Sequence, residues 1–167
     1  MPQFVRFSVD DVTHFEALRS VFTKIKSVKN LDYEIDPNIV DSAETSYDID
    51  AMRQLMPAPV QSNFDWPASS EIAEHKLDLN KPIRLSAPGA LRGARWSLVR
   101  ILDLIDTCEY SLDRCELIDR KIGELHVETH AYPYGGLNAL IALVEGFGFN
   151  VVGVNECGVY EPIIDAR

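Results

Sequence analysis

The chain has 167 residues, of which 46% are hydrophobic and 25% charged, and its formal net charge is −10. This composition is that of a globular protein long enough to bury a core, and it excludes a disordered or fibrous chain. The acidic excess argues against a nucleic-acid or anionic-membrane partner, because binding phosphates needs clustered Lys and Arg. Three cysteines without a CxxC pair and the lack of a secretion signal predict a cytoplasmic protein. The longest apolar run, 137–154, is too interrupted to span a bilayer.

The N-terminal part of the chain predicts one strand followed by one long helix. Residues 4–9 read as a short strand. From Val12 to Val28, apolar residues recur at three- and four-residue spacing, which predicts an amphipathic helix. Asp10 or Asp11 stands where the N-cap of this helix is expected.

A long irregular segment follows this helix. Residues 30–52 carry seven acids and no Lys or Arg, which is typical of a solvated loop, and we expect it to end in a short helix near 48–56. Five of the nine prolines lie between 57 and 88 and mark a connector in which regular structure is repeatedly interrupted. Phe64 and Trp66 are expected to anchor this connector onto the core.

The second half of the chain predicts a βαββαβ order. Its elements are a strand at 82–86, a helix at 94–106, a hairpin of strands at 109–118 and 123–131, a helix at 137–147 and a strand at 149–154. This order resembles the ferredoxin-like split βαβ motif, an α+β fold whose antiparallel sheet carries both helices on one face. The strand at 123–131 would then be central, between 82–86 and 109–118. Residues 1–80 would form a helical and irregular N-terminal extension packed on a core of residues 81–167.

The predicted central strand contains the sequence HVETH, which places two histidines and a glutamate on one face. His126, Glu128 and His130 alternate with apolar residues, so the apolar set should meet the helices and the polar set should lie on the open face of the sheet. Two imidazoles and a carboxylate are the ligands of many Fe, Mn or Zn sites. These three residues are therefore the candidate metal ligands.

Strand geometry restricts how such a site could form. Residues four apart on a strand lie about 13 Å from one another, whereas two ligands of one metal lie within about 4 Å. A site therefore needs a bulge, or one His/Glu pair with a ligand from a neighbour, for which Glu116, Glu156 and Cys157 are candidates. The alternatives are a partner surface, or an ordinary polar face whose Glu128 pairs with Arg84 or Arg114.

Two loops are expected to meet at one end of the predicted sheet and to form a ligand pocket. Four arginines and no acid lie between Arg84 and Arg100, a local reversal of the overall charge. Arginines, glycines and helix N-termini together favour a small anionic ligand. The alternative is that the arginines neutralise the acidic segment 32–50. The candidate ligand-binding residues are Arg92, Arg95, His130, Tyr132, Tyr134, Gly135 and Gly136.

These observations predict a small acidic binding protein for an anionic small molecule or a protein partner. That partner could be a second copy of the chain, forming a homodimer through the open sheet face. No cofactor is predicted, because neither a P-loop nor a Rossmann fingerprint is present. One alternative is a metal-dependent or acid–base enzyme that uses His126, Glu128 and His130. Another is an acidic inhibitor or immunity-like protein that neutralises a basic partner.

Overall fold

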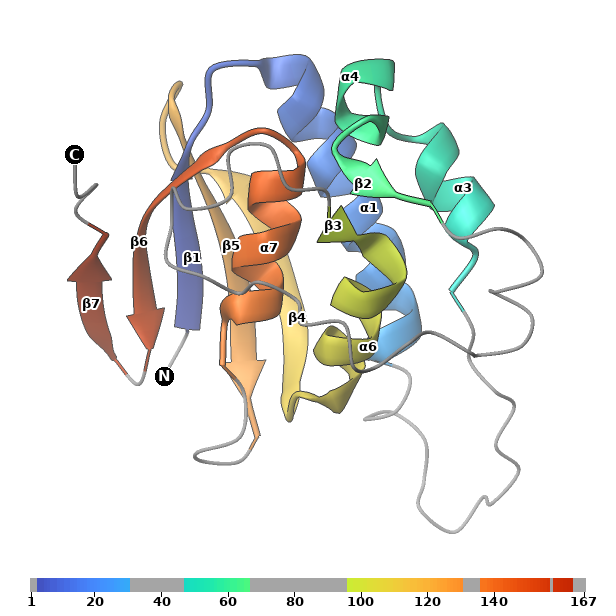
Figure 1. Ribbon diagram of the computed structural model, residues 1–167. Coiled ribbons are helices and arrows are strands. Elements are labelled where there is room, and N and C mark those ends of the chain that lie inside the picture. Colours follow the sequence, from blue (N-terminus) through green and yellow to red (C-terminus); the bar gives the residue numbers. More distant parts are fainter. Residues whose placement is uncertain (1–2, 31–46, 67–95, 131–135, 157, 164–167) are drawn as a thin grey trace, which may run out of the picture.

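A computed structural model describes residues 3–30, 47–66, 96–130, 136–156 and 158–163 (Figure 1). It is a mixed structure in which a five-stranded antiparallel sheet carries helices on one face. The sheet order is β4-β5-β1-β6-β7, with β1 (Gln3–Ser8), β4 (Tyr110–Leu117), β5 (Ile122–Thr129), β6 (Asn150–Glu156) and β7 (Val159–Pro162). The helices are α1 (Val12–Lys29), α3 (Ile49–Gln54), α4 (Ala58–Gln61), α6 (Leu98–Thr107) and α7 (Asn138–Gly146). A parallel pair of two-residue strands, β2 (Phe64–Asp65) and β3 (Trp96–Ser97), lies apart from the sheet.

The strand order differs from the predicted one, and the ferredoxin-like split βαβ arrangement is not confirmed. The predicted hairpin is present as β4 and β5, but β1 takes the place beside β5 that was assigned to residues 82–86, which lie outside the described residues. Val5 and Phe7 of β1 are fully buried, and both edges of the strand are paired, with β5 and with β6. These two side chains belong to the core, so burying their apolar surface stabilises β1 in this position.

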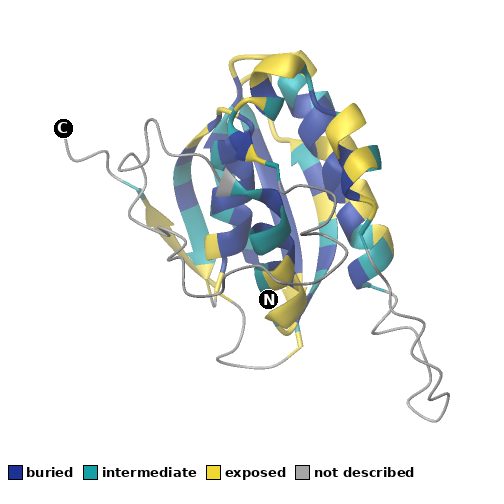
Figure 2. Cartoon of the chain, turned by 45° about the vertical axis from the view of Figure 1, so that its right-hand side comes forward, coloured by how far each residue is buried: buried dark blue, intermediate teal, exposed yellow. Residues whose placement is uncertain are grey.

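Helix α1 forms as its apolar spacing predicts. The side chain of Asp11 accepts hydrogen bonds from the backbone N–H groups of Thr13 and His14 at 2.8 and 3.2 Å. These bonds lower the pKa of Asp11, as expected for an N-cap carboxylate. The buried stripe that includes Phe15 and Phe22 faces the sheet, while exposed residues cover the outer side of the helix (Figure 2). None of the described helices is long and apolar enough to cross a membrane.

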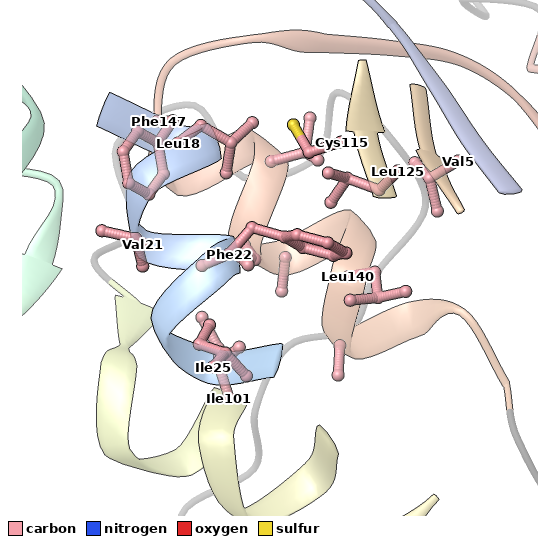
Figure 3. Close-up of a cluster of buried hydrophobic side chains, with 14 of the residues drawn as sticks. Val5, Leu18, Val21, Phe22, Ile25, Ile101, Cys115, Leu125, Leu140 and Phe147 are labelled. Atoms are coloured by element: carbon pink, nitrogen blue, oxygen red, sulfur yellow. The ribbon is translucent and has the colours of Figure 1, made fainter. Parts of the chain in front are cut away.

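The core lies between the sheet and the helices α1, α6 and α7. Figure 3 shows Val5 and Leu125 from the sheet close to Phe22 of α1 and Leu140 of α7, all of them buried. Cys115 of β4 belongs to the same core, and burial raises the pKa of its thiol to about 12. This thiol therefore stays protonated at neutral pH, which fits a structural role.

Phe64 anchors the connector onto the core, as predicted. Its side chain is 1% exposed and lies edge-on to Phe147 and Trp66, each with a centroid distance of 6.0 Å. A Cβ atom at Gly146 would overlap the Phe64 ring, so the helix α7 can approach this ring only with glycine at that position. Asn63 Nδ2 donates a hydrogen bond to the Gly146 carbonyl at 3.0 Å and fixes the same contact.

The outer edge of β4 is covered by polar side chains from the end of α1. Asn30 donates from Nδ2 to the Leu112 carbonyl at 2.9 Å and accepts from the Leu112 N–H at 3.0 Å, as a neighbouring strand would. Lys29 Nζ donates to the Cys108 carbonyl at 2.9 Å, just before the strand begins. At Leu112, therefore, side-chain groups take the place of a neighbouring strand.

Glu145 makes the stability of the fold depend on pH. Burial raises the pKa of this carboxyl group, which lies in the last turn of α7. A carboxyl group with a raised pKa in the folded state binds more protons than in the unfolded state, so stability falls as pH rises through these pKa values. We expect Glu145→Gln to raise the melting temperature at pH 7–8, and the gain to vanish below about pH 4, where both states of the wild type are protonated. Glu161→Gln, the same change at an exposed site, should show no such gain in a pH series of thermal melts.

Candidate metal centre

The candidate site lies on the outer face of the sheet, the face directed away from α1 and α7. Glu124 and His126 point to this face because the residues between and beside them, Gly123, Leu125 and Val127, are turned toward the core. Both polar side chains are nevertheless buried: Glu124 is 3% exposed and His126 is 5% exposed.

Phe4 and Arg6 of β1 lie beside these two residues across the strand pair. Phe4 is the register partner of His126, and the two ring centroids are 5.4 Å apart. Arg6 is the register partner of Glu124 and donates from Nε to Glu124 Oε1 at 2.6 Å. Although burial alone would lower it, the hydrogen bond and the negative charge of Glu124 raise the pKa of Arg6, so its guanidinium stays charged.

Three ligand-type side chains converge on one point of this face. His126 Nε2 lies 2.8 Å from Glu124 Oε2 on the same strand and 3.3 Å from Glu116 Oε1 on β4. One ligand atom from each residue lies within 4.8 Å of the other two. Nε2 is thus within ion-pair distance of both carboxylates although neither contact counts as a hydrogen bond, and Nδ1 makes no hydrogen bond within the described part of the chain. Ligands about 2.0–2.2 Å from one ion are separated by roughly 3–4 Å, so this spacing suits metal coordination.

A second arginine stands on the other side of the cluster. Arg114 donates from Nε to Glu116 Oε1 at 2.7 Å, and its Nη1 pairs with Asp113. Neighbouring residues of a regular strand point to opposite faces, but β4 has a register shift between Leu112 and Arg114 that lets Asp113 and Arg114 meet. The three carboxylates of Glu124, Glu116 and Asp113 and the two guanidinium groups of Arg6 and Arg114 leave one negative charge in excess around His126.

Tyr160 of β7 extends this arrangement across the sheet. The centroid of its ring lies 4.9 Å from the guanidinium carbon of Arg6. The same ring is stacked on Phe4, with a distance of 6.1 Å between the two centroids. The ring reaches over β6 because position 153 is a glycine, and a Cβ atom there would overlap the Tyr160 ring. Arg6 is therefore held between Glu124 on one side and aromatic rings on the other.

The structure separates the metal ligands predicted from the HVETH sequence. His126 lies in the cluster, whereas Glu128 and His130 are exposed, and His130 Nε2 lies 3.0 Å from Ser111 Oγ. The register shift lies in β4, not in β5, so the two histidines remain far apart along the strand. Glu116, one of the neighbouring residues considered from the sequence, completes the cluster together with Glu124, which the sequence analysis did not name.

The predicted anion pocket falls mostly on residues that the structure does not describe. Gly136 is exposed just before α7, and His130 ends the hairpin at the other side of this gap. Glu156, considered as a possible ligand, instead accepts a hydrogen bond from the Leu137 N–H at 3.3 Å. Six of the residues considered for a site lie outside the described ranges: Arg92, Arg95, Tyr132, Tyr134, Gly135 and Cys157.

Comparison of the chain with protein-family models, with curated proteins and with solved structures finds no match. The functional inference therefore rests on the side chains themselves. Among the described residues, Glu116, Glu124 and His126 are the group of carboxylate, imidazole and thiol side chains with the spacing of metal ligands.

Proposed function

We propose that the protein binds a divalent transition-metal ion on the outer face of its sheet, through Glu116, Glu124 and His126. The observation that carries this proposal is the state of His126. The imidazole is buried, and its Nε2 faces two carboxylate oxygens at 2.8 and 3.3 Å without making a hydrogen bond to either. An ion coordinated by these three atoms would satisfy the nitrogen and both oxygens together.

The donor set restricts the choice of metal. One imidazole nitrogen and two carboxylate oxygens suit Mn²⁺, Fe²⁺ or Zn²⁺, whereas Ca²⁺ and Mg²⁺ prefer oxygen ligands alone. Cu⁺ prefers thiolates, and the described thiol on β4, Cys115, belongs to the core on the opposite side of the sheet. Three protein ligands also leave coordination positions for water or for an anionic group of a ligand. The proposed activity is metal binding, and a metal-dependent reaction would be a further step.

The same strand supplies matched controls for a test of this proposal. Metal-free protein is titrated with Mn²⁺ and with Zn²⁺ by calorimetry, and its melting temperature is followed, since a ligand of the folded state raises it. We expect His126→Ala and Glu124→Gln to weaken binding at least about tenfold. His130→Ala and Glu128→Gln remove the same groups from the same face of β5, four residues further on, and should bind like the wild type.

Two results would contradict the proposal. The first is that neither ion binds the wild type. The second is that binding is lost in His130→Ala or Glu128→Gln but kept in His126→Ala, which would transfer the site to the exposed end of β5. Circular dichroism of each metal-free variant establishes that it is folded, so that a lost site is distinguished from a lost fold.

A further inference from the structure

We infer that Arg114 is a tethered counter-cation, which holds Glu116 in the metal-free protein and turns away when an ion binds. This inference rests on the metal site proposed above. Its basis is a difference between the two glutamates. Glu124 uses separate oxygens, Oε1 for Arg6 and Oε2 toward His126, whereas a single oxygen of Glu116, Oε1, meets both Arg114 and His126. An ion at the cluster can therefore leave the Arg6 pair in place, but an ion that binds Glu116 through Oε1 competes with Arg114 for that oxygen.

The surroundings of Arg114 allow it to move. Its side chain is 48% exposed, and exposed ion pairs contribute little to stability, so breaking one costs little. A second acceptor is already in contact, because Nη1 of Arg114 pairs with Asp113 across the register shift of β4. Arg114 can leave Glu116 and stay on Asp113, which keeps its charge compensated.

Arg6 shows the opposite behaviour and explains why only one arginine would move. It pairs with a carboxylate that is almost completely buried, and its guanidinium lies over the rings of Phe4 and Tyr160, at 5.2 and 4.9 Å from their centroids. Moving Arg6 would leave Glu124 charged and without its partner inside the protein, which is costly. Arg6 thus fixes one ligand, and Arg114 controls access to the other.

This arrangement predicts that the site binds metal more weakly than its three ligands alone would allow. A divalent ion must displace a cation that is attached to the same strand as Glu116, and it is then repelled by that cation nearby. Removing one unit charge about 6 Å from a divalent ion in a water-like dielectric corresponds to about a tenfold change in affinity.

The test compares Arg114→Gln with Arg120→Gln in calorimetric titrations with Mn²⁺ and Zn²⁺. Both changes remove one positive charge from the same hairpin, but Arg120 is an exposed turn residue. We expect Arg114→Gln to bind about tenfold more tightly than the wild type and Arg120→Gln to bind nearly as the wild type does. The gain of Arg114→Gln should shrink as the salt concentration rises, because salt screens the repulsion between the ion and a half-exposed charge.

Each other result points to a different failure. If Arg114→Gln binds as the wild type does, or more weakly, then Arg114 does not compete for Glu116 and the inference is wrong while the metal site stands. Equal gains in Arg114→Gln and Arg120→Gln would also overturn it, because overall charge would then explain both. If no variant binds either ion, the proposed metal site itself is wrong.

Discussion

Phe64→Ala is expected to lower the free energy of unfolding by about 3–5 kcal/mol, the usual cost of removing a fully buried phenylalanine. The ring fills the space between the connector and α7. It contacts Phe147 there, and Gly146 leaves room for it because glycine has no Cβ atom. Gly146, which faces the ring, has no side chain that could fill part of the resulting cavity. Urea denaturation of the wild type and the variant, followed by tryptophan fluorescence and circular dichroism, measures the difference.

Phe64→Leu is the matched control for this prediction. Leucine keeps most of the apolar volume, and we expect it to cost clearly less than alanine. If both variants were as stable as the wild type, the segment 47–66 would not depend on this contact for its place on the core. A loss in Phe64→Ala that is confined to Trp66 fluorescence would contradict the prediction of a global effect.

Arg6→Ala is expected to cost about 2–3 kcal/mol of stability. Breaking a buried ion pair from one side costs about 3–5 kcal/mol, because the other charge is left without a partner. The value is reduced here because the Arg6 side chain is 35% exposed, so water can partly replace it. Glu124 is the group left behind, and it lies on the interior strand β5 with almost no contact with solvent.

A double-mutant cycle with Glu124→Gln identifies this cause. In a Glu124→Gln background, Arg6→Ala leaves no buried charge without a partner, so it should cost less stability than in the wild type. The expected coupling free energy between the two substitutions is about 0.5–3 kcal/mol. The comparison is made by urea denaturation in metal-free buffer. Equal costs in both backgrounds would show that Arg6 stabilises the protein through its contacts with Phe4 and Tyr160 alone.

The type of most elements could be predicted from the sequence because it is encoded locally. The spacing from Val12 to Val28 and the cap at Asp11 are enough to define α1, and alternation is enough to define β4 and β5 as a hairpin. Strand partners are not encoded in this way. Arg6 and Glu124 are 118 positions apart, and neither sequence pattern contains information about the other. The strand order was therefore wrong although β1 and β5 were each predicted.

The candidate site was predicted in part, for the same reason. His126 was identified because the HVETH sequence has two histidines, and Glu116 was considered because it lies on the adjacent strand. Glu124 was missed although it precedes His126 by two residues and belongs to the same face. The signal was present: the alternation runs without interruption from Glu124 to His130, and a carboxylate on a predicted central strand requires a partner. The alternation does not indicate which of these residues is buried and which is exposed to solvent.

The polar cover that α1 places over β4 makes the two ends of the sheet unequal. At β4 the backbone groups of Leu112 are already bonded to Asn30, while β7 is the last strand at the other end of the described sheet. An added strand beside β4 would have to displace Asn30 from Leu112. We therefore expect any pairing of two copies through their sheet edges to involve β7 rather than this part of β4.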